Sequence, residues 1–430
     1  MKIAVVGVGY VGLVASACFA KLRHEVIGVD SDESKIKKLS RNIMPIYEPG
    51  LEELVKDGKK HGRLRFTADL SEAVKRSDVI FICVNTPPKK NGGADLSSIE
   101  RVCAAVAGAM TSYKLIVGKS TVPVKTGEWV RKTIKKFCKP GIEFDVASNP
   151  EFLREGTAIQ DFLKPDRIVI GVDSEKAKKI LLELYKDLEV PKVITDVNTS
   201  EMIKHAANSF LAMKISYINA LANICEKAGA DVNRIAEGIG YDKRIMRSFL
   251  NAGPGYGGFC FPKDVLAFIH IAGELGYDFH LLKSVDKINR EQKRHVFDIV
   301  KKQLKGLKGK KLGVLGIAFK PNTDDIRFSP AVEIIEMFKK AGASVSAFDP
   351  EAMENAKETL KGVKLCRDKY SVCKGADALV ILTDWEEFKA LDLKRVEKLL
   401  KHPVIIDARN LFDPEKMKAR GFTYKSIGRS

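Results

Sequence analysis

The stretch that decides the fold is KIAVVGVGYVGLVASACFAKLRHEVIGVD, which spans residues 2–30. Residues 2–8 form an apolar run that leads into glycines, which predicts a buried strand. Residues 11–22 predict a helix, and residues 25–30 predict a second strand. A strand, a helix and a strand in this order predict a parallel sheet with helices packed on its faces.

The turn between the first strand and the first helix has glycines at three fixed positions. Gly7, Gly9 and Gly12 give the spacing G-x-G-x-x-G. Such glycines allow a tight turn, close approach of the backbone to a pyrophosphate, and close helix–strand packing. Asp30 ends the second strand, where a carboxylate accepts hydrogen bonds from the adenosine ribose and repels a 2′-phosphate. The pattern predicts a dinucleotide site that prefers NAD to NADP, with Lys35 close enough to weaken that preference.

The remainder of the 430 residues continues the strand–helix alternation, with an interruption in the middle. Further strands are predicted at 79–84, 115–118, 144–148, 167–172 and 192–195, and again at 311–319, 344–349, 377–383 and 403–408, with helices at 95–110 and 125–137 among them. Thr199 to Ala228 lacks Pro and Gly and predicts one long helix or a tight helical pair. Further helices are expected at 231–237, 242–250, 263–275 and 281–305.

The predicted architecture is therefore α/β, with two Rossmann-like doubly wound domains joined by a helical connector that has a long central helix. The predicted boundaries are 1–196 for a NAD-binding domain, 197–300 for a helical dimerisation domain, and 301–430 for a second Rossmann-like domain. A weak internal sequence similarity supports the second domain. Residues 70–84 and 370–383 both place a short helix and an Asp before a buried strand.

Composition excludes several classes of protein. The hydrophobic fraction is 45% and the charged fraction 30%, which is typical of a globular protein, and no apolar run is long enough to cross a membrane. The N-terminus does not read as a signal peptide. The net charge of +18 comes from scattered basic residues without interleaved aromatics, so we expect no nucleic acid or membrane partner. The eight cysteines show neither CxxC nor zinc spacing, which predicts no metal and reduced thiols in the cytoplasm.

Polar residues gather where predicted strands end, which is where ligands bind in open parallel sheets. Val84–Pro88 (VNTPP), Ser120–Pro123 (STVP) and Asn149–Gly156 (NPEFLREG) each follow a strand. Glu151 and Glu155 are four residues apart and would share one face if their segment is helical. On the long predicted helix, Lys204 and Asn208 have the same spacing and would project together.

The densest signal is GPGYGGFCFPKD, residues 253–264. Its four glycines leave backbone N–H groups free to approach a phosphate or a sugar. Cys260 follows this loop, and Lys263 and Asp264 come three and four residues later. In a nucleotide-binding chain this placement favours a nucleophile over an ordinary core cysteine.

Seven segments together resemble the UDP-glucose/GDP-mannose dehydrogenase family over essentially the whole chain. They are GVGYVG, VNTPP, STVP, NPEFLREG, SEMIKHAANSF, GPGYGGFCFPKD and IAFKPNTDDIR. The form GYGG-x-CFPKD is more similar to the branch that oxidises UDP-glucose than to the N-acetylmannosamine branch. The resemblance implies a four-electron oxidation of carbon 6 of UDP-glucose to UDP-glucuronate with two NAD, through a thiohemiacetal and a thioester on Cys260.

The resemblance also implies a role for each matching residue. The catalytic set is Thr121, Glu151, Lys204, Asn208, Cys260 and Asp264. Cofactor contacts are expected from Gly7, Val8, Gly9, Tyr10, Val11, Gly12, Asp30, Lys35, Val84, Asn85, Thr86, Pro87, Thr121, Glu155, Lys263 and Arg327. Nucleotide-sugar contacts are expected from Glu151, Phe152, Leu153, Glu155, Lys204, Asn208, Arg244, Asn251, Gly253, Gly255, Tyr256, Gly257, Phe319, Lys320 and Arg409. Similarity of the long helix to the family's dimerisation helix implies at least a homodimer.

Two positions depart from the family's usual pattern. Phe259 stands where Ser is common, directly before Cys260, and Met246 replaces the Gly that usually follows Arg244 and Ile245. The nucleophile and its neighbours are retained, so the departures affect the expected substrate rather than the reaction. The alternatives are the same oxidation of UDP-N-acetylmannosamine or GDP-mannose, a two-electron dehydrogenase, and a NAD-binding regulator without chemistry. The last two would leave Cys260 unexplained.

Overall fold

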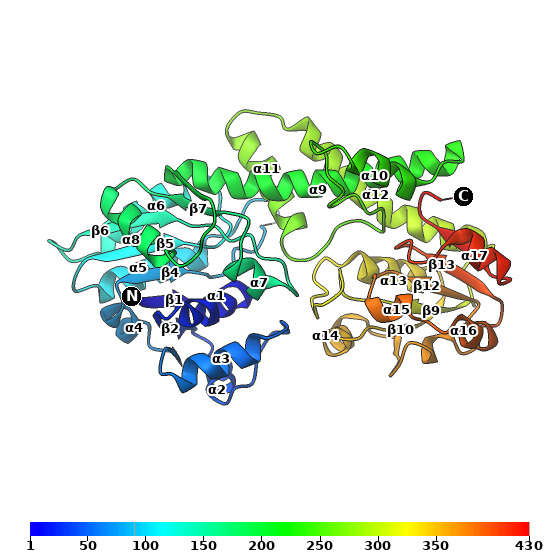
Figure 1. Ribbon diagram of the computed structural model, residues 1–430, viewed down its shortest axis with the longest axis horizontal. Helices are drawn as coiled ribbons and strands as arrows, with labels where there is room; N and C mark the ends of the chain where they lie inside the picture. Colours follow the sequence, from blue (N-terminus) through cyan, green and yellow to red (C-terminus); the bar gives the residue numbers. More distant parts are fainter. Residues whose placement is uncertain (90, 430) are drawn as a thin grey trace. The chain divides into compact units, whose positions relative to one another are not determined.

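A computed structural model describes residues 1–89 and 91–429 of the chain. It divides into two compact units, residues 1–207 with 270–276, and residues 208–269 with 277–430. Each unit contains one sheet flanked by helices; in Figure 1 the first sheet runs from blue to green and the second from yellow to red.

The sheet of the first unit has the strand order β3-β2-β1-β4-β5-β6-β7-β8. The strands are β1 (Lys2–Val6), β2 (Glu25–Val29), β3 (Leu64–Thr67), β4 (Val79–Ile82), β5 (Lys114–Gly118), β6 (Phe144–Ser148), β7 (Ile168–Gly171) and β8 (Lys192–Thr195). The first six follow the order typical of dinucleotide-binding sheets. β6 and β7 pair antiparallel, so the expectation of a wholly parallel sheet was wrong at that one junction.

Helices cover both faces of this sheet. They are α1 (Tyr10–Lys21), α2 (Glu33–Ser40), α3 (Leu51–Lys60), α4 (Leu70–Arg76), α5 (Ser97–Ala109), α6 (Thr126–Phe137), α7 (Ala158–Leu163) and α8 (Glu175–Leu184). Alternate residues of β1 enter two separate cores, with Ile3 and Val5 packed on the α1 side and Ala4 and Val6 on the α5 and α6 side. A central strand buried on both faces explains why residues 2–6 read as a nearly continuous apolar run.

The sheet of the second unit repeats the same topology, with the order β11-β10-β9-β12-β13-β14 and every pair parallel. Its strands are β9 (Lys311–Leu315), β10 (Ser344–Phe348), β11 (Lys364–Leu365), β12 (Ala378–Ile381), β13 (Val404–Asp407) and β14 (Thr423–Ser426). Its helices are α13 (Pro330–Lys340), α14 (Met353–Thr359), α15 (Glu386–Lys389), α16 (Leu393–Leu399) and α17 (Pro414–Ala419), with a 3-10 turn at Ser371–Cys373. The predicted fold class of two doubly wound α/β sheets with a helical connector is confirmed.

The segment between the sheets is helical. It contains α9 (Val197–Ala228), α10 (Val232–Gly240), α11 (Phe261–Glu274) and α12 (His280–Gln303). α9 is a single helix of 32 residues, which settles the choice between one helix and a tight pair. The unit boundary falls within α9, after Ala207.

Two local predictions were wrong. The helix predicted at 242–250 is absent, because Met246 and Phe249 have φ values of 62° and 65°, outside the right-handed helical region. The strand predicted at 311–319 ends at Leu315, because Gly316 turns the chain with φ 95°.

The weak similarity between residues 70–84 and 370–383 corresponds to equivalent strands of the two sheets. β4 lies beside β1, and β12 lies beside β9. The Asp78 N–H donates to the Lys2 carbonyl at 2.9 Å, and the Asp377 N–H donates to the Lys311 carbonyl at 2.7 Å. The similar sequences therefore mark the same position in the two sheets.

Cysteine burial matches the expectation that most of these residues are core. Six are buried, Cys138 is half-buried, and Cys260 is exposed. Among the described residues no helix is long and apolar enough to cross a membrane. Residues 1–89 and 91–429 hold no group of three or more His, Cys, Asp or Glu side chains placed to share a metal ion.

Candidate functional site

The glycine turn after β1 is shaped for close backbone approach. Gly7 has φ 94°, and a Cβ there would lie 2.9 Å from the Cys83 carbonyl oxygen. A Cβ on Gly12 would lie only 1.8 Å from the Gly7 carbonyl oxygen, so helix α1 can pack this closely only with glycine. A Cβ on Gly9 would meet no atom within 4 Å, so the space in front of this residue is open. These are the three roles predicted for the motif, and they suit a dinucleotide pyrophosphate.

A cavity of about 440 Å³ opens in front of this turn. Its lining includes Gly7, Gly9, Asp30, Lys35, Val84 and Asn85, all predicted cofactor residues, together with Ser98 and Arg101 from α5, which the sequence reasoning missed. Asp30 accepts hydrogen bonds from the N–H groups of Val8 at 3.1 Å and Asp32 at 3.0 Å, and it pairs with Lys35 at 2.8 Å. The residues fit an adenosine ribose, with the charge of Lys35 beside the carboxylate as expected.

The loops that follow β4 and β5 are joined to each other. The Thr86 hydroxyl donates to the Thr121 carbonyl at 2.9 Å, and the Ser120 hydroxyl donates to the Val84 carbonyl at 2.7 Å. The structure thus brings the VNTPP and STVP segments together at the carboxyl edge of the sheet, as predicted.

A buried carboxylate, Glu48, joins the glycine turn to the loop after β6. It accepts the Tyr10 hydroxyl, the Gly156 N–H at 2.6 Å and the Ala158 N–H at 2.7 Å. Burial and the neighbouring Glu48 raise the pKa of Tyr10 above its usual range, so this tyrosine stays a hydrogen-bond donor. Sequence reasoning missed Glu48, whose three partners are 38 to 110 residues away in sequence.

Glu151 and Lys204 form a buried ion pair at 3.0 Å, with side-chain exposures of 6% and 5%. The second carboxylate oxygen of Glu151 accepts the Leu153 N–H at 2.6 Å, and the Lys204 ammonium lies over the Phe152 ring at 5.2 Å. The segment that follows Glu151 is not helical, so the idea that Glu151 shares a helix face with Glu155 was wrong.

Lys119 is a second buried lysine near this pair, and the sequence reasoning also missed it. The Lys119 ammonium donates to the Asn149 side-chain oxygen at 3.0 Å, and the Tyr185 hydroxyl donates to the same oxygen at 2.5 Å. Burial lowers the pKa of Lys119 to about 8. Lys119 and Asn149 directly precede the STVP and PEFLREG residues, so this network fixes where both loops begin.

In the second unit, Cys260 is exposed at the N-terminal end of α11 and its carbonyl accepts the Asp264 N–H at 2.9 Å. The start of a helix favours an anion, so a cysteine at this position is suited to be a nucleophile. Asp264 pairs with Lys263 at 2.6 Å and accepts the Asn208 amide at 2.6 Å. Asn208 lies on α9 one helical turn after Lys204, as predicted.

The glycine loop before Cys260 is held by amide side chains on α9 and α12. The Gly253 N–H donates to the Asn219 side chain at 2.8 Å, and Gln292 donates to the Gly253 carbonyl at 2.9 Å. Asn289 makes two such bonds to the backbone of Tyr256. Asn219, Asn289 and Gln292 were missed, because buried amides on helices show no motif in sequence.

The glycine loop also contacts two other predicted nucleotide-sugar residues, Phe319 and Arg409. Arg409 donates to the Phe319 carbonyl at 3.0 Å and to the Leu382 carbonyl at 2.8 Å. A Cβ on Gly253 would lie 3.3 Å from the Arg409 guanidinium, and one on Gly258 would lie 2.7 Å from the Phe319 ring. The structure therefore brings the glycine loop, Phe319 and Arg409 together.

Comparison with known proteins agrees with this arrangement. The UDP-glucose/GDP-mannose dehydrogenase family matches in three parts: its NAD binding domain over residues 1–189, its central domain over 198–291, and its UDP binding domain over 313–414. The chain belongs to the UDP-glucose/GDP-mannose dehydrogenase family. It is accordingly an oxidoreductase, and NAD is its cofactor.

Individual relatives cover the whole chain. UDP-glucose 6-dehydrogenase TuaD of Bacillus subtilis is 48% identical over 429 residues, covering 100% of this chain and 93% of the relative. UDP-glucose 6-dehydrogenase of Rhizobium meliloti is 47% identical, covering 100% of both. Among solved structures, the UDP-glucose dehydrogenase of the hyperthermophilic archaeon Pyrobaculum islandicum is 40% identical with a TM-score of 0.94, covering 100% of this chain and 98% of that one.

Phe259, which departs from the family's pattern, packs against two predicted cofactor residues. Its ring lies 4.4 Å from the Arg327 guanidinium and 5.7 Å from the Lys263 ammonium. Arg327 is also held by Asp325, at 2.7 Å. An aromatic ring between two cations is a favourable arrangement that Ser could not provide.

Of the remaining predicted family site residues, Arg244 and Asn251 are exposed, whereas Tyr256 lies in the glycine loop and Lys320 follows Phe319. Arg244 is 89% exposed on its side chain and pairs only with Asp242 among the contacts described, at 2.7 Å. Tyr256 is 4% exposed and packs its ring against Phe261. Lys320 lies beside Phe319, with its ammonium 5.9 Å from that ring.

Proposed function

We propose that the chain oxidises carbon 6 of UDP-glucose from alcohol to carboxylate, giving UDP-glucuronate and consuming two NAD+. One observation carries the proposal: an exposed Cys260 at a helix N-terminus, beside the buried Lys263–Asp264–Asn208 cluster and a glycine loop. A two-electron dehydrogenase that stops at the oxidation of an alcohol to an aldehyde or ketone has no use for such a nucleophile. The printed activity of relatives at 47% and 48% identity supports UDP-glucose as the substrate.

The first step requires removal of the hydroxyl proton at carbon 6. Bound NAD+ supplies a hydride acceptor for this step and for the second oxidation. Lys204 and Asp264, acting through a water, would assist removal of this proton. The pairing of Lys204 with Glu151, and of Asp264 with Lys263, keeps these charged groups balanced although they are buried.

The second step requires a covalent bond to the aldehyde carbon. The Cys260 thiolate would add to it to form a thiohemiacetal, which the second oxidation converts to a thioester. Lys204 and Asn208 would donate hydrogen bonds to the oxyanions. One such donor typically lowers the barrier by about 3–4 kcal/mol.

The last step is hydrolysis of the thioester. Glu151 would act as the base for the attacking water, and Thr121 would help to hold that water. Hydrolysis releases the carboxylate product and restores the Cys260 thiol. Glu155 is proposed to lie between the cofactor and the sugar.

The remaining predicted residues are proposed to bind rather than to react. The cofactor set is Gly7, Val8, Gly9, Tyr10, Val11, Gly12, Asp30, Lys35, Val84, Asn85, Thr86, Pro87, Lys263 and Arg327. The nucleotide-sugar set is Phe152, Leu153, Arg244, Asn251, Gly253, Gly255, Tyr256, Gly257, Phe319, Lys320 and Arg409. The contacts of Arg409 and Phe319 with the glycine loop support the second set.

The stoichiometry of NADH per sugar tests the proposal. UDP-glucose, UDP-N-acetylmannosamine and GDP-mannose are each supplied in limiting amount with excess NAD+. We expect two NADH per UDP-glucose. One NADH per sugar would refute the four-electron reaction, and turnover of only another nucleotide-sugar would reassign the substrate.

A cysteine variant tests the covalent step. Cys260→Ser should lose steady-state turnover by at least about 10³-fold, since an alcohol is a far weaker nucleophile at neutral pH. The half-buried Cys138, changed to Ser, is the matched control and should keep full activity. Full activity of Cys260→Ser would show that the mechanism is wrong.

We also propose that the chain forms at least a homodimer through α9. Phe210, Tyr217 and Ile224 are 57%, 53% and 59% exposed and recur every seven residues, so they share one face of the helix. Tyr217→Lys should shift the mass measured by light scattering toward the monomer. An unchanged mass for a Tyr217→Lys, Ile224→Lys double variant would contradict this interface.

The division into domains at 1–196, 197–300 and 301–430 remains part of the proposal, as do the cytoplasmic location and the absence of a nucleic acid or membrane partner.

A further inference from the structure

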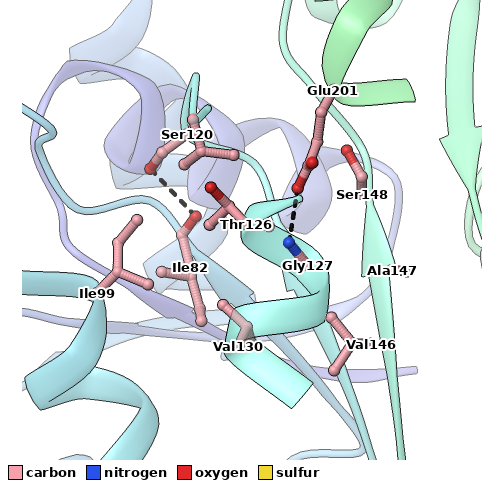
Figure 2. Close-up of a pocket in the computed structure, with 12 residues that line it drawn as sticks. Ile82, Ile99, Ser120, Thr126, Gly127, Val130, Val146, Ala147, Ser148 and Glu201 are labelled. Atoms are coloured by element: carbon pink, nitrogen blue, oxygen red, sulfur yellow. Dashed lines mark hydrogen bonds between the residues drawn. The ribbon is translucent and has the colours of Figure 1, made fainter. Parts of the chain in front are cut away.

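The first three turns of α9 contact the chain between the end of β5 and the first turn of α6 at two buried points. The Gly127 N–H, in the first turn of α6, donates to a Glu201 carboxyl oxygen at 2.8 Å (Figure 2). One helical turn further along α9, the His205 Nε2 lies 2.8 Å from the Val122 carbonyl oxygen. Both contacts therefore fix the same stretch, residues 119–127, from one face of one helix.

The Glu201 carboxyl group is placed in an unusual environment for an acid. The residue is 4% exposed, and its second carboxyl oxygen has no hydrogen-bond partner among the described residues. It borders a small cavity of about 20 Å³ whose other walls include the apolar Ile82, Ile99 and Val130 (Figure 2). Full ionisation there would leave a desolvated charge with no counter-ion at hydrogen-bond distance.

Burial raises the pKa of Glu201 to about 8, against opposing backbone N–H groups at 125–127. The charged groups that face it are few. Glu128, exposed on α6, raises the pKa further, and His205 lies one turn along α9. The raised pKa favours the neutral acid at neutral pH, and one carboxyl oxygen accepts the Gly127 N–H.

The segment held in this way carries a proposed catalytic residue. Thr121 lies between the two contacts, and its carbonyl is also tied to Thr86. On α9, Lys204 lies between Glu201 and His205 and pairs with Glu151. Any loosening of the two contacts would move Thr121 relative to Lys204 and Glu151.

We propose that Glu201 is a positioning residue: through the Gly127 N–H, and together with His205, it holds the 119–127 segment so that Thr121 stays in register with Lys204 and Glu151. This rests on the roles proposed above for those three residues. Glu201 itself is not expected to touch substrate or cofactor. Its effect is therefore on kcat rather than on the binding of either ligand.

Three variants separate the effect of the Glu201–Gly127 hydrogen bond from the effect of the charge on Glu201. Glu201→Gln keeps the oxygen that accepts the Gly127 N–H but cannot ionise, and Glu201→Ala removes the contact. Glu128→Gln is the control, because it removes a carboxylate from the same helix turn at an exposed site. We expect Glu201→Ala to lower kcat about 10- to 100-fold with both KM values within about twofold, as misplacement of a catalytic group does. Glu201→Gln should keep the wild-type kcat at pH 7.

The pH profile gives the second readout. As pH rises through about 8, wild-type kcat should fall as Glu201 ionises, and Glu201→Gln should lack that component of the fall. The ionisation of Glu201 also affects stability. Between pH 4.5 and about 8, Glu201 is protonated in the folded state but ionised in the unfolded state. The free energy of unfolding of the wild type therefore declines as the pH rises across that window. The difference in Tm between Glu201→Gln and wild type should therefore widen up to about pH 8 and then stay constant.

The inference is overturned if folded Glu201→Ala keeps wild-type kcat, or if Glu201→Gln loses as much kcat as Glu201→Ala at pH 7. An equal effect of Glu128→Gln on the pH profile would also overturn it. The Tm comparison needs no substrate. A wild-type protein that makes no NADH from UDP-glucose would thus defeat the proposed function, while the Tm profiles would still report on Glu201.

Discussion

The two sheets have the same strand order, and the turns that follow their first strands differ in one instructive way. Gly7 and Gly316 occupy the same place, with φ values of 94° and 95°. The second strand of each sheet leads to an Asp whose carboxylate accepts N–H groups from that turn: Asp30 from Val8, and Asp349 from Ile317 and Ala318. The backbone framework of a dinucleotide turn is present twice.

Only the first turn leads directly into the N-terminus of a helix. There, helix α1 begins at Tyr10, so its free N–H groups lie directly after Gly9. In the second turn, Ala318 and Pro321 stand where Gly9 and Gly12 stand in the first, and the next helix begins only at Pro330. Asp349 is fully buried and also accepts the Trp385 indole N–H at 3.2 Å. Equal topology thus supports a glycine turn that opens a helix in the NAD binding domain, and a turn held by a buried aspartate in the UDP binding domain.

The largest expected effect comes from removing the two aspartates. Asp349→Ala should lower the free energy of unfolding by about 3 kcal/mol or more, because it leaves four buried N–H donors without partners. Asp30→Ala, at the cavity, should lower it by less than about 1 kcal/mol but weaken NAD+ binding and its preference over NADP+. Denaturant unfolding and cofactor titration measure both. Equal losses of stability would remove the distinction between the two turns.

The next effect concerns the second glycine of the motif. Gly9→Ala places a methyl group in open space, so Tm should change little, while NAD+ affinity falls by more than about tenfold because the pyrophosphate loses its close approach. Calorimetric titration gives the Kd. The matched change in the second sheet, Ala318→Gly, should leave NAD+ affinity unchanged. A normal Kd for Gly9→Ala would place the pyrophosphate elsewhere.

A basic residue follows the fifth strand in each sheet, and these residues can be compared directly. Lys119 is buried against Asn149, whereas Arg409 spans the Leu382 and Phe319 carbonyls beside the glycine loop. Arg409→Lys cannot reach both carbonyls, so KM for UDP-glucose should rise about tenfold with KM for NAD+ unchanged. Steady-state kinetics with the exposed Arg420→Lys as control provides the measurement. A matching rise in both KM values would argue for a general disturbance instead.

The smallest effect is expected at Phe259. A cation–π contact of about 0.5–1 kcal/mol holds Arg327 to its ring, so Phe259→Ser should raise KM for NAD+ about two- to fivefold. Phe259→Tyr keeps the ring and should behave as wild type. If Phe259→Ser instead changed the preference among nucleotide-sugars, this position would act on the substrate and not on the cofactor side.

Motif-bearing parts of the site could be predicted from sequence, and supporting parts could not. The GxGxxG turn, VNTPP, STVP and the loop before Cys260 are contiguous, so their spacing is visible in the chain. Glu48, Lys119 and Glu201 act through partners 30 to 110 residues away. Each is a single polar residue in an otherwise ordinary stretch, and nothing local distinguishes it from a solvated side chain.

Dependence on distant parts of the chain also explains why some helices and strands were predicted wrongly or missed. Residues 242–250 have helix-forming side chains, yet the chain there adopts positive φ at Met246 and Phe249. β3, β11 and β14 were missed because edge strands are short and only partly buried, which blurs their apolar pattern. Tertiary packing overrides local preference at each of these places.

The sequence by itself determined the two doubly wound sheets, the NAD turn and the position of Cys260 before a helix, because these depend on periodicity and on contiguous spacing. Only the tertiary structure decided which buried polar residues hold the loops and that the second glycine turn closes on its own aspartate. It also decided that Phe259 lies against Arg327. These depend on contacts between residues far apart in the chain, where a hydrogen bond exists only once packing has excluded water from both partners.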